Sequence, residues 1–279
     1  MKVKHLLKVV GILIFTGTLF FSCNITNNEK SGKNDTVDSL GVQSDLAYEK
    51  AKVIFYSLPS PVETALLLEG SGITFNEEFL NPASKLSKYN TSRDLALNMG
   101  VYGADLSFCS LFEQNQKAIH YMAVIKEISE ELNIINSIND SLINLLQENM
   151  NDKNKVLSIL SETFVKSNTY LEENDRNEIA ALIIAGGWIE GLYISSNIIG
   201  KDIKGNADLV EVVIGQGFTL EDLLGLLEMF IQNQDVKIVY DQLKQLKVEF
   251  DLLQTDQVTE KQFNIFVSKV NKVRNSFTL

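Results

Sequence analysis

Histidine, cysteine and proline are scarce in this 279-residue chain, and each scarcity excludes a class of structure or chemistry. The two histidines, His5 and His120, are too few for the paired Glu-x-x-His motifs of helical di-iron proteins or for a zinc site built from several imidazoles. Nucleophile elbows, Walker sequences and dinucleotide-binding fingerprints are also missing from the sequence. The sequence therefore predicts no metal site and no bound cofactor, and these absences count against an enzyme without excluding one.

Positive charge is also in short supply. The chain has 25 Lys and Arg residues against 36 Asp and Glu, a formal net charge of −11, and no basic cluster follows residue 30. Proteins that bind nucleic acid concentrate Lys and Arg to displace counterions from phosphates, and electrostatic adhesion to anionic lipid needs similar clusters. The composition predicts no nucleic-acid partner and no electrostatic attachment to a membrane.

All three prolines precede residue 83, which leaves a long proline-free stretch of the kind that long helices require. Residues that favour helix N-termini occur along this stretch and just before it. Capping boxes are predicted for Ser60 with Glu63 and for Thr259 with Gln262, and single caps are predicted at Asn81, Thr91 and Thr219.

Apolar residues in the C-terminal third recur at helical spacing. In each of two runs the apolar residues are spaced three or four positions apart, so they form one narrow apolar seam along a helix. A short polar segment, 254–258, separates the two runs. We predict an antiparallel helical hairpin here and, because no comparable stretch alternates as a strand would, an all-α fold: an irregular multi-helix bundle of antiparallel helical hairpins. The seam residues are Val236, Val239, Leu243, Leu246, Phe250 and Leu253 in the first run and Phe263, Phe266, Val270, Val273 and Phe277 in the second.

The chain begins with the pattern of a secretory leader: three lysines within the first eight residues and an apolar run from Leu6 to Ser22. That run is shorter than the roughly 20 residues that span a membrane. The segment Leu19-Phe20-Phe21-Ser22-Cys23 resembles the lipobox of bacterial lipoproteins, with Phe21 where a small or aliphatic residue is commoner. The resemblance implies that Cys23 is acylated and becomes the first residue of the mature protein. The alternatives are an ordinary cleaved leader or an uncleaved anchor.

The same resemblance sets an expected location and domain boundaries. Asn24 follows Cys23, whereas aspartate at that place retains lipoproteins at the inner membrane in some bacteria, so the outer membrane is favoured. We predict a signal peptide at 1–22, a lipidated cysteine with a flexible polar tether at 23–44, and a single α-helical domain at 45–279. The body resembles all-helical lipoproteins of Gram-negative envelopes whose roles are uncharacterised.

Cys109 is the other cysteine, and it has no partner for an intrachain disulfide if Cys23 is lipidated. A reactive thiolate needs a nearby cation, and none is close to Cys109 in the sequence. We therefore expect Cys109 to be a small buried hydrophobic residue in a fold that is held by packing.

A polar stripe interrupts an otherwise apolar segment near residue 100. Asn98, Tyr102 and Asp105 fall at i, i+4 and i+7, which places them on one face of a helix. Glu190 lies in a second segment that is apolar nearly all round, so that segment is expected at the centre of the bundle. If the two helices pack together, these side chains converge, and a pair of carboxyl groups in a dry site raises the pKa of one of them.

Glycines in these two segments predict a close helix crossing. Gly186, Gly187 and Gly191 each cost about 1 kcal/mol relative to alanine in a helix, so close approach of another backbone is expected as compensation. The segment 100–106 can also be laid on 186–192 with a shift of 86 residues, a faint internal echo of glycine, aromatic residue and leucine.

Two functional hypotheses follow, with a third kept open. The leading one is a non-catalytic cell-envelope lipoprotein, held to a membrane through Cys23, that acts as a helical binding or interaction module for a protein partner. The alternative is an envelope hydrolase or transferase that uses Asp105 and Glu190 as an acid-base pair in an open cleft. Against that, Asp105 could bond a neighbouring helix end and Glu190 could pair with Arg93 or Arg176. A small-molecule carrier would need an apolar cavity near the aromatic candidates. The candidate binding residues are Asn98, Tyr102, Trp188 and Tyr193.

Overall fold

A computed structural model describes residues 58, 60, 62–63, 65–66, 74–134, 140–200, 202–253 and 258–278, all of which belong to one compact unit, residues 43–279. The signal peptide, the lipidation site Cys23 and the tether that the sequence predicts all lie outside the described residues. Within the described ranges the chain forms helices and no strand, so the all-α prediction is confirmed. The elements are η1 (Glu77–Phe79), η2 (Ala83–Lys88), α3 (Ser92–Leu111), α4 (Asn115–Glu131), α5 (Asp140–Glu148), α6 (Lys153–Glu173), α7 (Asn177–Ile199), α8 (Ala207–Met229), α9 (Gln234–Leu253) and α10 (Glu260–Phe277).

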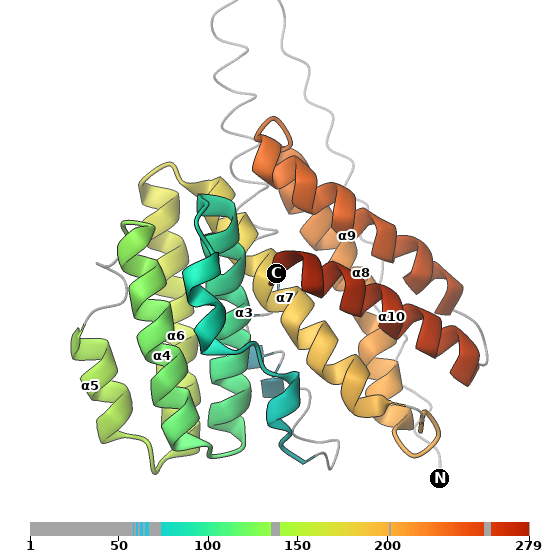
Figure 1. Cartoon of the computed structure of the whole chain (residues 1–279), viewed down its shortest axis with the longest axis horizontal. Coiled ribbons are helices and arrows are strands. Elements are labelled where there is room, and N and C mark those ends of the chain that lie inside the picture. The colour runs from blue at the N-terminus through green and yellow to red at the C-terminus, as the bar shows by residue number, and fades with distance from the viewer. Residues whose placement is uncertain are drawn as a thin grey trace, which may run out of the picture. The chain divides into compact units, whose positions relative to one another are not determined.

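Helix α7 is the centre of the bundle, as its uniformly apolar sequence predicts. It packs against α3 more extensively than any other pair of elements, and it also contacts α6, α8, α9 and α10. Figure 1 shows α4 and α6 beside α3 on one side, and α8, α9 and α10 on the other side of α7. By length and composition α7 is apolar enough to cross a membrane, but 89% of its most apolar window is buried inside this fold.

The crossing of α3 and α7 depends on two glycines that approach the opposite backbone. A Cβ atom added to Gly100 would lie 1.9 Å from the carbonyl oxygen of Ile183, and one added to Gly186 would lie 1.9 Å from that of Leu97. Gly100 and Gly186 are the aligned glycines of the internal echo, and Leu97 and Ile183 are separated by the same 86 residues. The two contacts are therefore reciprocal, which makes this crossing locally symmetric.

The predicted hairpin at the C-terminus is confirmed. Every residue of the two predicted seams is buried, and α9 and α10 contact each other. Gln242, early in α9, bonds Ser276 near the end of α10, and Glu249, later in α9, pairs with Lys269, which comes earlier in α10. The two helices are therefore antiparallel.

The predicted helix starts are confirmed at three places and wrong at two. Ser60 and Glu63 exchange both bonds of a capping box, Thr91 accepts a bond from the Asp94 amide, and Thr259 forms a capping box with Gln262. Thr219 instead lies inside α8, because the apolar face there continues on both sides of it. Asn81 caps no helix, since Pro82 takes the N-cap position of η2 and the Asn81 side chain is used elsewhere.

Candidate functional site

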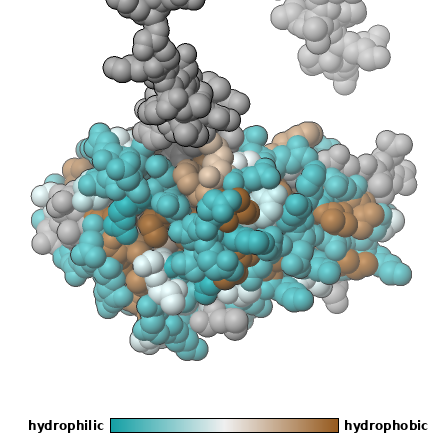
Figure 2. Space-filling view, turned by 90° about the horizontal axis from the view of Figure 1, so that it is seen from above, coloured by the Kyte–Doolittle hydropathy of each residue, from teal (hydrophilic) through white to brown (hydrophobic). Residues whose placement is uncertain are grey.

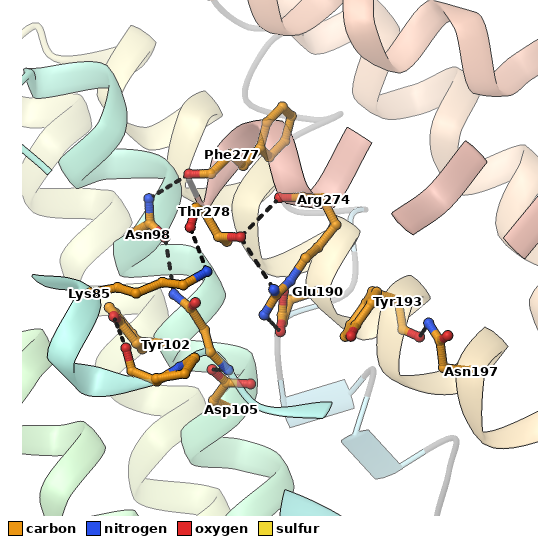
Figure 3. A network of polar contacts seen from close by, with 12 residues as sticks. Lys85, Asn98, Tyr102, Asp105, Glu190, Tyr193, Asn197, Arg274, Phe277 and Thr278 are labelled. Carbon is orange, nitrogen blue, oxygen red and sulfur yellow. Dashed lines mark hydrogen bonds and ion pairs between the residues drawn. The ribbon is translucent and has the colours of Figure 1, made fainter. Parts of the chain in front are cut away.

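A buried polar network lies where α3, α7, η2 and the last turn of α10 meet (Figure 3). Each element contributes side chains for a local reason. The polar stripe of α3 bonds Pro82 and the end of α10, Glu190 lies on a helix that is buried nearly all round, and Arg274 lies beside the seam of α10, between Val273 and Phe277. Asp105, Glu190 and Arg274 are thus placed together in the buried core of the bundle.

Glu190 and Arg274 form a bidentate ion pair in this core. The Nε and Nη2 atoms of Arg274 donate to the two carboxylate oxygens of Glu190, each at 2.7 Å. The Glu190 residue is 0% exposed and Arg274 is 5% exposed. The guanidinium also lies 4.5 Å from the ring centre of Tyr193 and donates through Nη1 to Thr278 Oγ1. A planar guanidinium suits such a site because it satisfies a carboxylate and an aromatic face together.

The prediction that Glu190 pairs with Arg93 or Arg176 is therefore wrong. Arg93 forms ion pairs with Asp94 and Asp235 at the surface, and Arg176 donates to the carbonyl oxygen of Leu132. Both come before Glu190 in the chain, whereas the true partner is 84 residues after it. The signal for Arg274 was its spacing: it lies four residues after Val270 and three before Phe277, on the seam side of α10.

Asp105 occupies the same site without a cation of its own. It is 0% exposed, and its Oδ2 accepts a bond from the backbone amide of Asn81 at 3.0 Å. Among the described residues its Oδ1 accepts no hydrogen bond from any donor.

The surroundings act differently on the two carboxyl groups. Burial, reinforced by the nearby negative charge of Glu190, raises the pKa of Asp105 well above its ordinary value. Burial also raises the pKa of Glu190, but the charge and hydrogen bonds of Arg274 oppose that rise. The site therefore favours the protonated form of Asp105, whereas Arg274 stabilises the carboxylate form of Glu190.

Neutral side chains surround this core and satisfy the backbone of η2. Asn81 donates through Nδ2 to Tyr89 Oη at 3.0 Å and to Asn98 Oδ1 at 3.3 Å. Tyr121 donates to the Asn81 carbonyl oxygen at 3.1 Å, and Tyr102 donates to that of Pro82 at 3.0 Å. Burial raises the pKa of the Tyr89, Tyr102 and Tyr121 hydroxyls, so they act as hydrogen-bond donors rather than as bases.

The same residues hold the end of α10. Asn98 Nδ2 donates to the carbonyl oxygen of Phe277 at 2.7 Å, and Lys85 Nζ donates to that of Thr278 at 2.9 Å. The last carbonyl groups of a helix have no partner within the helix, so these bonds cap it from outside. Lys85 is half-buried, and this burial together with the charge of Arg274 lowers its pKa.

The structure brings together some of the candidate residues and leaves one apart. Asn98, Tyr102, Asp105 and Glu190 meet in one network, and Tyr193 covers Arg274 at its edge. Trp188 lies on another face of α7, where its Nε1 donates to Gln216 of α8. The residues that the sequence did not reveal are Lys85, Asn81, Tyr89, Arg274 and Thr278.

Over the ranges that the structure describes, the carboxyl groups of the network are not accessible to solvent. Both carboxyl groups are fully buried, and both oxygens of Glu190 already bond Arg274. Acid-base catalysis requires a group within hydrogen-bonding reach of the reacting atom. In the described part of the chain, moreover, no group of three or more His, Cys, Asp or Glu side chains could hold a metal ion. Cys109 is buried, and burial raises the pKa of its thiol, which makes it a poor nucleophile.

Comparison with known proteins adds no relative. No protein-family model, curated protein or solved structure matches this chain. What can be said of function therefore comes from the residues themselves.

Proposed function

We propose that this protein is a non-catalytic lipoprotein of the cell envelope, anchored through Cys23 to the outer membrane rather than to the inner one. Its helical body is a binding or interaction module for a protein partner in the envelope. The proposal combines the lipobox resemblance of residues 19–23 with the closed character of the polar network.

One observation carries the non-catalytic part of the proposal: the Glu190–Arg274 pair is sealed in the core. An acid-base enzyme that used Asp105 and Glu190 would need a cleft through which substrate reaches them. Instead, Asp105 accepts a hydrogen bond from the Asn81 backbone amide, and Arg274, in the last turn of α10, bonds both carboxylate oxygens of Glu190. This arrangement fixes the relative positions of α3, α7 and α10, which is a structural role.

The surface suits a body that works in water beside a membrane. Figure 2 shows a face on which hydrophilic residues predominate and hydrophobic residues emerge in separate patches. The most exposed large hydrophobic residues in the described ranges are Phe218 at 70%, Val248 at 59% and Leu252 at 56%. Membrane attachment is thus assigned to the acyl chains, and a partner would contact the body.

The experiment that tests this proposal is site-specific photocrosslinking in living cells. A photoreactive amino acid is placed at Phe218, Val248 or Leu252 of the full chain and, as a control, at the exposed Lys166. We expect one envelope protein to be crosslinked from the hydrophobic positions and not from the control.

The same cells can be used to distinguish the interaction module from the acid-base enzyme. A Glu190→Gln, Arg274→Met double variant keeps the shape of the core while removing both charges. If the double variant folds and keeps its crosslinks but loses the cellular activity of the native protein, the non-catalytic proposal is wrong. Equal crosslinking from every position, including Lys166, would contradict a specific partner.

A further inference from the structure

The exposed side of α10 is basic, although the chain as a whole is acidic. Lys261, Lys269 and Lys272 are exposed there, and Glu260 is the acidic residue of this helix. Lys269 reaches Glu249 of α9 at 3.8 Å, whereas Lys261 and Lys272 form no ion pair with any described residue. Helix α8, which packs against the same α9, carries five acidic residues and no Lys or Arg. Positive charge is therefore concentrated on one helix of this side of the bundle.

Three aliphatic side chains are exposed on the same helical hairpin. Val248 and Leu252 of α9 are 59% and 56% exposed, and Ile265 of α10 is 46% exposed. Glu249 pairs with Lys269 across the hairpin. Because the helices run antiparallel, Leu252, three residues further along α9, lies beside Ile265, four residues back along α10. Val248 precedes Leu252 by one turn of the same helix, so the three side chains form one apolar strip across the hairpin.

The lysines lie at both ends of this strip. Lys261, Ile265, Ser268 and Lys272 fall at i, i+4, i+7 and i+11, which places them on one side of α10. Eleven residues of helix separate the two lysines by about 16 Å along the axis. The surface formed by Val248, Leu252, Lys261, Ile265 and Lys272, called the α9–α10 face below, thus has an apolar centre and a free cation towards each end.

Charge complementarity determines which kind of partner suits the α9–α10 face. A single exposed aliphatic residue is ordinary, but a strip of three with a cation at each end matches an amphipathic helix whose apolar residues are flanked by Asp or Glu. The acidic surface of α8 would repel such a helix, so the charges also direct it to the α9–α10 face. Two antiparallel helices present a shallow groove in which a third helix packs at 8–10 Å.

Anionic lipid is less well matched to the same surface. Protein surfaces that lie on membranes anchor with Trp, Tyr or Phe, and the exposed hydrophobic residues of the α9–α10 face are all aliphatic. Each lysine near anionic headgroups contributes only about 1 kcal/mol, and two free lysines are few for that purpose.

We propose that the α9–α10 face binds an acidic amphipathic helix of a protein partner, with the apolar residues of that helix on Leu252 and Ile265 and its carboxylates at Lys261 and Lys272. The inference rests on the proposed function, because it specifies which segment of the envelope partner makes the contact.

The test is photocrosslinking of the full chain in cells, with the crosslinked segment of the partner identified by mass spectrometry. The photoreactive amino acid is placed at Leu252 or Ile265 and, as matched controls, at Leu145 of α5 or Val165 of α6, which are 42% and 45% exposed. We expect crosslinks from the first two positions and none from the controls. The crosslinked segment should be an amphipathic helix with acidic residues about 11 positions apart, matching the spacing of the two lysines.

Charge reversal tests the electrostatic part of the proposal. Lys261→Glu with Lys272→Glu should reduce the crosslink from Leu252 by at least about tenfold, because like charges would then face each other. The matched control is Lys155→Glu with Lys166→Glu on the exposed side of α6, which changes the net charge equally and should alter the crosslink by less than about twofold. Replacing Lys261 and Lys272 with arginine should preserve the crosslink.

Several results would overturn the proposal. They are crosslinks to phospholipid or to a second copy of this chain, a crosslinked segment without acidic residues, and equal loss in the two charge-reversed variants. Crosslinks from Phe218 alone would also overturn it while leaving the interaction module intact, whereas no crosslink from any hydrophobic position would contradict the proposed function as well. Urea unfolding shows whether each variant is folded, and the mapped segment still decides if a charge-reversed variant is not.

Discussion

Asp105 and Glu190 are two carboxyl groups in one dry site, and a single guanidinium cannot neutralise both. Arg274 bonds both oxygens of Glu190 and stabilises its carboxylate form, whereas burial favours the protonated form of Asp105. Burying the ionised form of Asp105 costs more free energy than burying the protonated form. The stability of the folded protein therefore depends on pH through this residue.

The first prediction concerns Asp105→Asn. The pKa of Asp105 in the folded protein lies well above the value of about 3.9 expected for an unfolded chain. Its contribution to stability is therefore fully present below about pH 3.9 and is lost as the pH rises towards the folded pKa, by up to about 1.4 kcal/mol per pH unit. Asparagine mimics the protonated acid, so the variant should lose less stability between pH 5 and pH 8, as measured by urea unfolding.

The control for this variant is Asp222→Asn, at an exposed position of α8. It should give a pH dependence parallel to that of the native protein. If Asp105→Asn also runs parallel to the native protein, the pKa of Asp105 is not raised in the folded protein.

The second prediction concerns Arg274→Met. This change leaves the Glu190 carboxylate buried without its cation, so it should lower the free energy of unfolding by about 3–5 kcal/mol. Adding Glu190→Gln should recover most of the loss, because no unpaired charge then remains in the core. Arg93→Met, which removes a surface ion pair, should lower stability by less than about 1 kcal/mol. Additive effects of Arg274→Met and Glu190→Gln in denaturant unfolding would contradict the pairing.

At the scale of elements, the α3–α7 crossing sets the geometry of the whole core. The two helices approach so closely that backbone meets backbone at Gly100 and Gly186. This approach brings the polar stripe of α3 within reach of Glu190. A larger residue at either glycine would separate the helices and open the network.

The third prediction therefore concerns Gly100→Ala. The added Cβ atom would lie 1.9 Å from a carbonyl oxygen, so the helices must shift, at a loss of about 3 kcal/mol of stability. Gly215→Ala is the matched control, since a Cβ atom there has nothing within 4 Å inside helix α8. That control should stabilise the protein by up to about 1 kcal/mol through helix propensity alone. Thermal unfolding of both variants distinguishes steric contact from propensity, and similar effects of the same sign would refute the close crossing.

The fourth prediction compares two threonines that look alike in the sequence. Thr259 caps α10 in a box with Gln262, so Thr259→Ala should lower stability by about 1 kcal/mol. Thr219 lies within α8, so Thr219→Ala should be neutral or slightly stabilising, because alanine favours helices. Denaturant unfolding measures both changes. Equal losses would mean that α8 begins at Thr219 and not at Ala207.

At the scale of the whole molecule, the proposal separates anchoring from folding. The described body is an acidic helical bundle, and its most apolar helix is used for the core. The acyl chains proposed at Cys23 would supply membrane affinity, at about 0.8 kcal/mol for each buried methylene group.

The fifth prediction is that Cys23→Ser releases a folded protein from the membrane. Cell fractionation should find the variant in the soluble fraction, with the helical circular dichroism of the native body. Cys109→Ala is the control: it changes the buried cysteine of α3 and should stay with the membrane. If the Cys23→Ser protein is unfolded, or remains membrane-bound after leader cleavage, anchoring does not depend on acylation at this cysteine.

The sequence alone determined the features that depend on residues a few positions apart. The seams of α9 and α10, the caps at Thr91 and Thr259, and the central place of α7 follow from helical periodicity and from local hydrogen bonding. Helix geometry also put Asn98, Tyr102 and Asp105 on one stripe before any packing was known.

Only the tertiary structure decided which distant groups meet. Arg274 and Glu190 are 84 residues apart, so their pairing depends on the angle at which α10 crosses α7 and not on any local pattern. Asn81 looked like a helix cap, yet its backbone amide bonds Asp105 and its side chain bonds Tyr89 and Asn98. Periodicity fixes which face of a helix is buried, whereas the partner on that face is chosen by packing of the whole bundle.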